Sequence, residues 1–337
     1  MIDVELEVLG RARDLAYPAT RRAVMTLHDD LRRPTEYHLG WTDVDGTPLG
    51  GKGGKGVRAA LAIVSAEAAH APGLVGVPGA VAIELIHNFS LLHDDIIDTD
   101  RERRHRPTVW AVFGVGSAII VGDALMALAP IVLLEEVTPA RVNATRRLFD
   151  ATAAMIEGQA DDMAFESATD VTLPECMRMV ERKTGALLAF ASSVGAVLAG
   201  ADTEVVDALE SYGHHLGIAF QAVDDLLGIW GDPQVTGKPV GGDLAQRKKT
   251  LPVCAALACE RLEAAELSAL FASGSLDERA IARASQLVEA AGGREYTEQL
   301  AETHLTRALD ALRSSALDDH AVAQLEALAR FVTKRDH

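Results

Sequence analysis

Residues 92–110 read LHDDIIDTDRERRHRPTVW, and residues 220–252 read FQAVDDLLGIWGDPQVTGKPVGGDLAQRKKTLP. Each stretch places aspartates in or beside an apolar helical segment and follows them with arginines or lysines. Carboxylates bind hard metal ions, and cationic side chains bind phosphate oxygens. The two stretches together therefore predict a site for a diphosphate and its magnesium ions.

The first cluster consists of Asp94, Asp95 and Asp98, directly after the periodic apolar run of residues 79–92. At about 100° per residue, Asp94 and Asp98 share one helix face, with Asp95 beside them. Such crowded carboxylates destabilise a helix unless a cation lies between them, and Mg²⁺ is usually held by one or two carboxylates plus substrate phosphates. A solvated acidic helix end would explain this cluster taken alone.

A second cluster, Asp224 and Asp225, makes a metal site the better explanation. It lies in another apolar helix, with Gln221 one turn before Asp225 on the same face. Two such clusters can clamp one diphosphate. Each nearby cation, taken singly, is more simply a solvated surface charge. The cations are Arg103 and Arg104, suited to bidentate phosphate contacts, and Lys183, Lys238 and Lys248, which act as movable point charges.

Over nearly its whole length the sequence resembles the trans-isoprenyl diphosphate synthases, or polyprenyl synthetases. Five positions depart from the family pattern. Gly228 stands where a third aspartate often lies, Ala59 replaces a proline, His105 and Arg106 replace a common Gly-Lys pair, and Arg247 replaces a glycine. The matching motifs are Gly54-Lys55-Gly56-Val57-Arg58, Asp94 to Asp98 with Arg103-Arg104 and Pro107-Thr108, Gly122-Asp123, Gly158-Gln159-Ala160-Asp161-Asp162, Lys183-Thr184 and Phe220 to Asp225.

The resemblance implies a role for each matching residue, and it implies that Mg²⁺ is the cofactor. Asp94, Asp98 and Asp224 would be the main metal ligands, supported by Asp95 and Asp225. Arg103, Lys183 and Lys238 would hold the allylic diphosphate, with Thr184, Gln221 and Lys248 nearby, and Lys55, Arg58, His87 and Arg104 would bind isopentenyl diphosphate. Asp94, Asp95, Asp98, Arg103, Lys183, Asp224 and Lys238 form the expected catalytic set.

Product length is expected to depend on the residues four and five positions before Asp94. Ser90 is small and shares the Asp94 face, so a growing tail could pass it, whereas Phe89 is bulky enough to close the cavity. This pattern resembles the geranylgeranyl-producing type and favours a twenty-carbon product. The alternatives are that Phe89 only packs between helices, and that the product is farnesyl diphosphate.

The rest of the sequence predicts an all-α bundle of the isoprenoid synthase type around a deep central cavity. Alanine and leucine are abundant, strand patterns are scarce, and no linker or repeat divides the 337 residues, so one domain spanning 1–337 is expected. Apolar residues recur at helical spacing in residues 3–33, 57–70, 79–99, 116–135, 139–166, 173–200, 203–230, 277–291 and 293–314.

The formal net charge of −17 argues against nucleic-acid partners and against docking on anionic lipid. The uncharged residues 186–201 are too few for a membrane span, which needs about 18 to 20. The three cysteines show no paired spacing and no secretion signal is visible, so a cytoplasmic protein with reduced thiols is expected. The resemblance suggests a homodimer.

Two other function classes remain open. A class I terpene cyclase of the same fold would need the aspartates but not a second diphosphate pocket, so Lys55, Arg58, His87 and Arg104 count against it. A non-catalytic partner subunit could lack metal ligands, whereas this chain has both clusters. The sequence therefore favours head-to-tail prenyl transfer between an allylic diphosphate and isopentenyl diphosphate.

Overall fold

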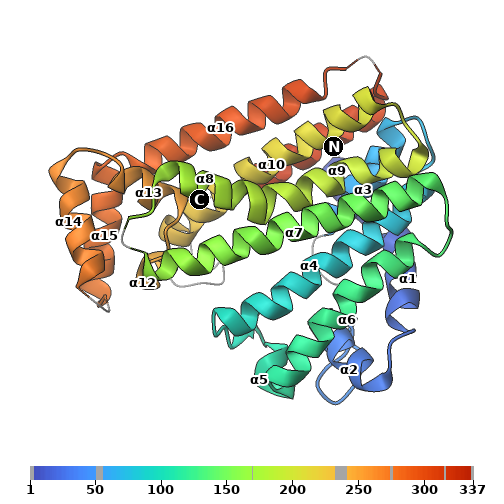
Figure 1. Ribbon diagram of the computed structural model, residues 1–337, viewed down its shortest axis with the longest axis horizontal. Helices are drawn as coiled ribbons and strands as arrows, with labels where there is room; N and C mark the ends of the chain where they lie inside the picture. Colours follow the sequence, from blue (N-terminus) through green and yellow to red (C-terminus); the bar gives the residue numbers. More distant parts are fainter. Residues whose placement is uncertain are drawn as a thin grey trace. The chain divides into compact units, whose positions relative to one another are not determined.

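A computed structural model describes residues 4–50, 56–168, 170–231, 241–273, 276–314 and 316–334 of the chain. Within these ranges the regular elements are helices, apart from one two-stranded hairpin and an isolated bridge between Thr42 and Pro48 (Figure 1). The predicted all-α class is confirmed.

The chain divides into two compact units. The first contains residues 1–150, 190–210 and 312–328, and the second contains residues 151–189, 211–311 and 329–337. Helices α7 (Pro139–Ser167), α9 (Ala186–Ala199), α10 (Thr203–Trp230) and α17 (Asp319–Thr333) contribute residues to both. The expectation of a single domain stays a prediction.

The first unit holds the N-terminal helices and the hairpin. Helices α4 and α6 lie side by side along much of their length (Figure 1). Its elements are α1 (Val4–Val24), α2 (Asp29–His38), α3 (Val57–Ala68), the 3₁₀ helix η1 (Gly73–Gly76), α4 (Val77–Ile97), β1 (Glu102–Arg103), β2 (Arg106–Pro107), α5 (Val109–Phe113) and α6 (Val115–Leu133).

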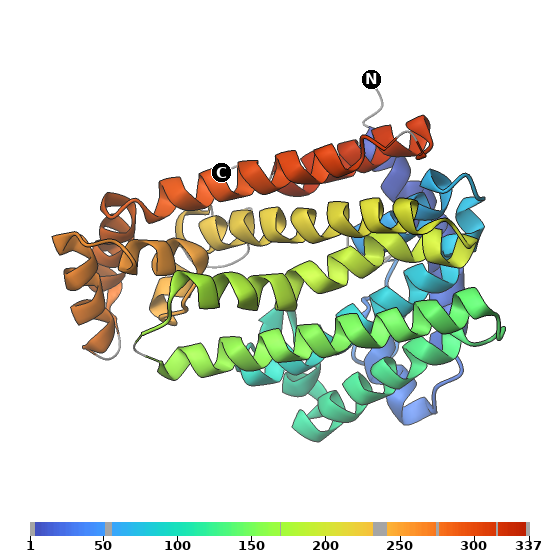
Figure 2. The same cartoon turned by 45° about the horizontal axis from the view of Figure 1, so that its top comes forward.

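The second unit holds the C-terminal helices, among which α14 and α15 lie side by side, in orange in both views (Figures 1 and 2). Its core includes a buried cluster around Ile229, Leu244, Val253 and Leu287. Its elements are α8 (Leu173–Val180), the π-helix η2 (Glu181–Gly185), α12 (Gly242–Ala245), α13 (Leu251–Leu257), α14 (Leu262–Ala272), α15 (Glu278–Ala290) and α16 (Gly293–Ala311).

Glycines bring three helices of the first unit into close contact. A Cβ at Gly195 of α9 would lie 2.2 Å from the carbonyl oxygen of Ala62 on α3, and one at Gly79 of α4 would lie 2.6 Å from a methyl group of Val194. The amide of Gly195 also donates to Oγ of Ser65 at 2.9 Å. This packing fixes helix α4, whose C-terminal end carries the first aspartate cluster.

The expectation of one helix over residues 3–33 is wrong, because α1 ends at Val24 and a separate helix α2 begins at Asp29. The side chain of His28 caps α2 by accepting a hydrogen bond from the amide of Asp30, and acidic residues in the first turn favour a helix start there. The apolar period alone did not reveal this boundary.

Two helices are long and apolar enough to cross a membrane by length and composition alone. They span Gly73–Ile97, with mean hydropathy 1.4, and Val115–Leu133, with mean hydropathy 2.0. Of the most apolar window, 56% is buried in the first and only 39% in the second. Buried core helices meet the same criteria, so the absence of a membrane span stays a prediction.

Candidate active site

The first aspartate cluster lies at the C-terminal end of α4. Asp94 and Asp95 belong to its last turn, and Asp98 is the C-cap, whose amide donates to the carbonyl of Asp94 at 2.8 Å. Asp94 and Asp98 are half-buried, whereas Asp95 is only 1% exposed. The helix therefore brings the three predicted carboxylates together but turns one of them inward.

The buried carboxylate of Asp95 is held by Arg103, whose Nε donates to Oδ1 at 2.6 Å. Burial raises the pKa of Asp95 to about 6, against the opposing effect of the Arg103 charge. The other oxygen, Oδ2, is buried and has no hydrogen-bond partner among the residues that the structure describes. An oxygen left without a partner beside two further aspartates fits a hard cation.

Arg104 lies in the turn of the hairpin that follows this cluster. Strands β1 and β2 pair antiparallel, with Arg103 opposite Arg106. The two turn residues, Arg104 and His105, have φ angles of 54° and 61°, which a type I′ turn requires at both positions. A glycine would adopt this conformation without steric strain, so His105 costs on the order of 1 kcal/mol in local conformation.

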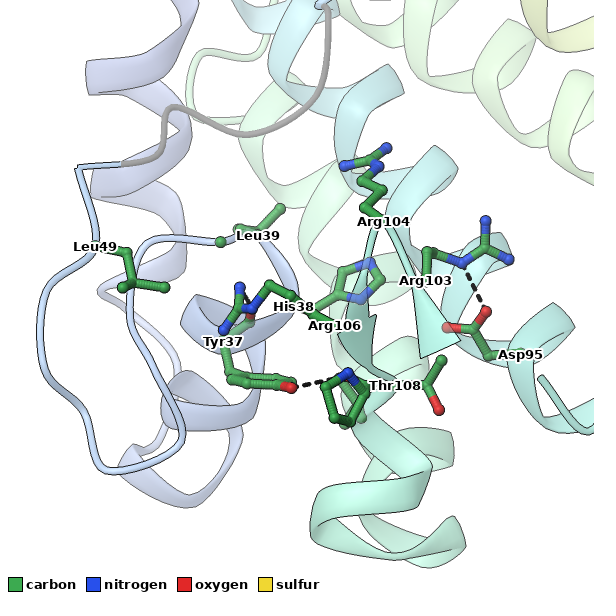
Figure 3. Close-up of a pocket in the computed structure, with 12 residues that line it drawn as sticks. Tyr37, His38, Leu39, Leu49, Asp95, Arg103, Arg104, Arg106 and Thr108 are labelled. Atoms are coloured by element: carbon green, nitrogen blue, oxygen red, sulfur yellow. Dashed lines mark hydrogen bonds and ion pairs between the residues drawn. The ribbon is translucent and has the colours of Figure 1, made fainter. Parts of the chain in front are cut away.

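A cavity of about 280 Å³ lies between the end of α2, the loop that follows it and the hairpin (Figure 3). Arg106 is fixed in its wall, because its guanidinium donates to the carbonyls of Tyr37 and Thr42 at 3.1 and 3.0 Å. The lining includes His38, Asp95, Arg103, Arg104, Arg106 and Thr108. The cavity is thus rich in cationic groups.

The residues expected to bind isopentenyl diphosphate gather near this hairpin. Burial, followed by the charges of Arg58 and Arg104, lowers the pKa of His87 well below its ordinary value. Both arginines are therefore close enough to His87 to act on its charge. The charges of Arg58 and Arg104 also act on Glu84, which accepts a hydrogen bond from the amide of Ala59 at 3.3 Å. The fourth predicted residue, Lys55, lies outside the described residues.

The second aspartate cluster lies within α10 and divides in the same way as the first. Asp224 is exposed, whereas Asp225 is 5% exposed and accepts hydrogen bonds from Nε2 of Gln221 at 2.8 Å and from the amide of Leu251 at 2.9 Å. Burial raises the pKa of Asp225 to about 8 despite these two donors. Thr184 extends the network by donating to Oε1 of Gln221 at 2.8 Å.

A π-helical turn positions Lys183 and Thr184 in the second unit. The π segment η2 interrupts the helical run between α8 and α9, a feature often found at functional sites. Glycines allow its close packing, since a Cβ at Gly158 would lie 2.4 Å from the amide nitrogen of Lys183 and one at Gly217 would lie 2.7 Å from Cα of Gly185. The ammonium group of Lys183 pairs with Asp162.

The space beside Gly228, where the third aspartate is missing, is occupied by another carboxylate. A Cβ at Gly228 would lie 1.9 Å from Oδ2 of Asp243, which belongs to helix α12. Asp243 also helps to raise the pKa of Asp225, so it is a neighbour of the second cluster. The lost carboxylate thus has a nearby substitute.

The remaining predicted residues have the following positions. The amide of Lys248 donates to the carbonyl of Asp243 at 2.9 Å, which places Lys248 beside α12, and Lys238 lies outside the described residues. Phe89 is buried and its ring meets that of His93 edge to face, with centroids 4.9 Å apart. Oγ of Ser90 donates to the carbonyl of His87 at 2.9 Å.

Two residues that the sequence did not single out, His38 and Asp243, belong to these neighbourhoods, and so does Asp162, which was given no role of its own. Asp162 stands in the stretch Gly158 to Asp162, so its place in a family motif was a usable signal. No sequence pattern joins His38 to the hairpin or Asp243 to Gly228, because both contacts are between separate elements.

Each cluster lies within one unit, the first in unit one and the second in unit two. Within the described ranges, no group of three or more histidine, cysteine, aspartate or glutamate side chains is close enough to hold a metal ion by itself. Carboxylate pairs are still the donors that a divalent ion uses when substrate phosphates and water complete its shell. Convergence of the two clusters on one ligand stays a prediction.

Helices that carry aspartate clusters with arginine or lysine close by define a class of helical enzymes acting on diphosphates. A family model described as polyprenyl synthetase matches residues 48–288. The chain belongs to the polyprenyl synthetase family and is a trans-prenyltransferase. Members of this family use divalent metal ions.

Named relatives are similar over almost the whole chain. The (2E,6E)-farnesyl diphosphate synthase of Mycobacterium tuberculosis H37Rv is 46% identical over 334 residues, 98% of this chain and 93% of the relative. The geranylgeranyl diphosphate synthase of the same strain is 43% identical over 333 residues, 97% and 94% of the two chains. A polyprenyl synthetase structure from Streptomyces coelicolor A3(2) matches with a TM-score of 0.92 and 51% identity, over 97% of this chain and 99% of that one.

Proposed function

We propose that the chain condenses an allylic diphosphate with isopentenyl diphosphate, uses Mg²⁺, and releases geranylgeranyl diphosphate. Head-to-tail prenyl transfer follows from the family; the particular substrates, metal and product are our proposal. The observation that carries it is the repeated arrangement of a half-buried or exposed aspartate next to a buried, hydrogen-bonded aspartate, once at α4 and once at α10.

The reaction requires an electrophile but no protein nucleophile. The bond between the allylic carbon and the diphosphate oxygen breaks, and its electron pair leaves with the diphosphate. The double bond of isopentenyl diphosphate then attacks the allylic carbon, and a proton is lost to the released diphosphate. Preorganised positive charge around the leaving group lowers the barrier to the first step.

The chain's residues divide these tasks between them. Arg103, Lys183 and Lys238 would hold the allylic diphosphate, while Arg58, His87 and Arg104, together with Lys55, would hold isopentenyl diphosphate and orient its double bond. Asp94, Asp98 and Asp224 would bind the magnesium ions, which supply further charge stabilisation for the departing diphosphate. Asp95, Asp225 and Asp243 support these ligands from buried or adjacent positions.

The twenty-carbon product is supported by the residues before the first cluster. Ser90 is half-buried and small, and buried Phe89 stands one residue further from Asp94. Farnesyl diphosphate is the alternative product, since the 46% identical relative carries that name. The two products differ by one isoprene unit, so product analysis separates them directly.

We further propose that the chain acts in the cytoplasm as a homodimer whose two units form one catalytic domain in each subunit. Helix α6 exposes Ile119, Ile120 and Ile131. Helix α7 exposes Val142, Phe149, Ile156 and Met163, which are spaced by seven residues and therefore lie on one helix face. A second copy of the chain would cover such an apolar surface.

The direct test is to incubate the purified protein with isopentenyl diphosphate, Mg²⁺ and each allylic primer in turn, and to measure product length. We expect a mainly twenty-carbon diphosphate. Fifteen-carbon products would retain the reaction and correct the product, whereas cyclic hydrocarbons formed without isopentenyl diphosphate would overturn the proposed condensation.

Replacement of Asp98 by alanine tests the metal assignment. Because Asp98 is only a half-buried C-cap, Asp98→Ala should lower kcat by at least about a hundredfold with little loss of thermal stability. Steady-state kinetics over a range of Mg²⁺ concentrations and a melting curve measure both effects. Near-normal turnover would remove Asp98 from the metal site.

A further inference from the structure

The cavity in Figure 3 contains a cationic side chain that makes no hydrogen bond or ion pair with the residues that the structure describes. Of its three arginines, Arg103 is bound to Asp95, and Arg106 is bound to the carbonyls of Tyr37 and Thr42. Arg104 is different: within the described part of the chain its guanidinium makes no hydrogen bond or ion pair. It is therefore available to an anion.

His38 contributes a second nitrogen without a partner to the same cavity wall. It is the last residue of α2 and hydrogen-bonds to Asn88 on α4. The amide nitrogen of Asn88 in turn donates to the carbonyl of Glu84 at 2.7 Å. The other ring nitrogen, Nε2, is buried and has no hydrogen-bond partner among the described residues. Buried polar atoms of this kind usually have a partner.

The charges around His38 indicate what that partner is. Burial, followed by the charges of Arg104, Arg103 and Arg106, lowers the pKa of His38 to about 3, so its imidazole is neutral in the free protein. His87 faces the same group of charges from α4, and Asp95 is the acidic residue that lines the cavity. A bound anion would offset the arginines, allow Nε2 to carry a proton, and accept a charge-assisted hydrogen bond from it.

We infer that His38 is a further binding residue for the diphosphate group of isopentenyl diphosphate, to which it donates a hydrogen bond from Nε2 beside Arg104. This inference rests on the proposed function, which places Arg104 and His87 at that diphosphate. Figure 3 shows the imidazole of His38 between helix α2 and the hairpin that carries Arg103 and Arg104, where an anion in the cavity would meet both elements.

Two substitutions separate binding from structure. An asparagine amide carries both a donor and an acceptor and can keep the hydrogen bond to Asn88, whereas a glutamine amide reaches the position of Nε2. We expect His38→Asn to raise the KM for isopentenyl diphosphate about tenfold, with kcat, the KM for the allylic primer and the melting temperature nearly unchanged. His38→Gln should recover most of the affinity.

The matched control is His28→Asn at the opposite end of the same helix. His28 is an exposed N-cap, and asparagine is also a good cap, so this variant should match the wild type in both KM values. If His38→Asn leaves the KM for isopentenyl diphosphate unchanged, or if it lowers stability and raises both KM values together, His38 is a structural residue and the inference is wrong.

A measurement without turnover gives an independent answer. Isopentenyl diphosphate is added to metal-free, full-length protein labelled with ¹⁵N in histidine, and the Nε2 resonance of His38 should move to the position of a protonated imidazole. Inorganic diphosphate serves as a second probe. If it moves the resonance in the same way, the diphosphate group alone is recognised. If the resonance moves with isopentenyl diphosphate and not with inorganic diphosphate, the carbon tail is also needed. An unmoved resonance in a protein that forms prenyl products overturns the role of His38 alone, whereas failure to form any product overturns the proposed function.

Discussion

Both aspartate pairs divide in the same way at the scale of single residues. Asp94 and Asp224 keep contact with solvent, whereas Asp95 and Asp225 are buried and hydrogen-bonded. Neighbouring residues in a helix differ by about 100°, so one member of each pair faces inward when the other faces outward. The sequence predicted which residues cluster, but not which carboxylate of each pair is accessible.

Sequence reasoning missed the residues that meet the site from a separate element. Gly228 was recognised as a lost carboxylate, but the presence of Asp243 in the vacated space depends on how α12 packs against α10. The role of Gly158 likewise became clear only from its contact with Lys183. A motif records which residues are present, whereas such steric complements require coordinates.

Phe89 provides a prediction at this scale. If its ring closes the tail cavity, Phe89→Ala should shift the products by one or more isoprene units toward longer chains, because the ring and its contact with His93 are removed. Deleting a buried phenylalanine side chain costs about 3 to 5 kcal/mol, so the assay should be run well below the melting temperature. Chromatography of the dephosphorylated products measures the shift, and an unchanged distribution would mean that Phe89 only packs between helices.

At the scale of elements, helical periodicity predicted the long helices well. The segment expected over residues 203–230 is α10, and the segment expected over 139–166 is α7 to within one residue. Helices α13, α14 and α17 were not predicted, and the hairpin was missed because its strands have two residues each and its turn contains no glycine or asparagine. A two-stranded hairpin depends on tertiary packing more than on local pattern.

The contact between α10 and α16 leads to a pH prediction. Nδ1 of His304 lies 3.1 Å from Nδ1 of His215, and burial, followed by the charges of His215 and Arg307, lowers the pKa of His304 to about 4. Between pH 6.5 and 4 the unfolded chain binds a proton at this residue and the native chain does not. The free energy of unfolding should therefore fall as pH decreases through this window, by at most about 1.4 kcal/mol per pH unit from this residue.

Urea unfolding at several pH values measures this contribution. His304→Gln should show a shallower decrease between pH 6.5 and 4 than the wild type, because the glutamine side chain does not titrate. Equal slopes for the wild type and His304→Gln would contradict the assignment.

At the scale of the whole molecule, the apolar surface of α6 and α7 predicts the oligomeric state. Phe149 is 50% exposed on α7, and Leu262, on α14, is 88% exposed and serves as the control position. Sedimentation should give twice the chain mass of 35.8 kDa for the wild type and for Leu262→Asp. Phe149→Asp should give the mass of a single chain, because a charge buried in a dimer interface loses its hydration without gaining a partner. A monomeric wild type, or a dimeric Phe149→Asp, would exclude this face as the interface.

The composition gave no spatial relation between the two clusters. Scarce strand signals and abundant alanine and leucine predicted an all-α protein, and the family motifs predicted its reaction class. Whether Asp94 and Asp224 meet at one diphosphate depends on long-range geometry, to which local periodicity contributes nothing.

The meeting of α3 and α9 at Gly195 has a mechanical consequence. There the two backbones approach so closely that no side chain larger than hydrogen fits at Gly195, and the hydroxyl of Ser65 accepts a hydrogen bond from the Gly195 amide. A larger residue at this position would push the two helices apart. Helix α4 packs against α9 at Gly79, so such a displacement would also move the helix that carries the first aspartate cluster.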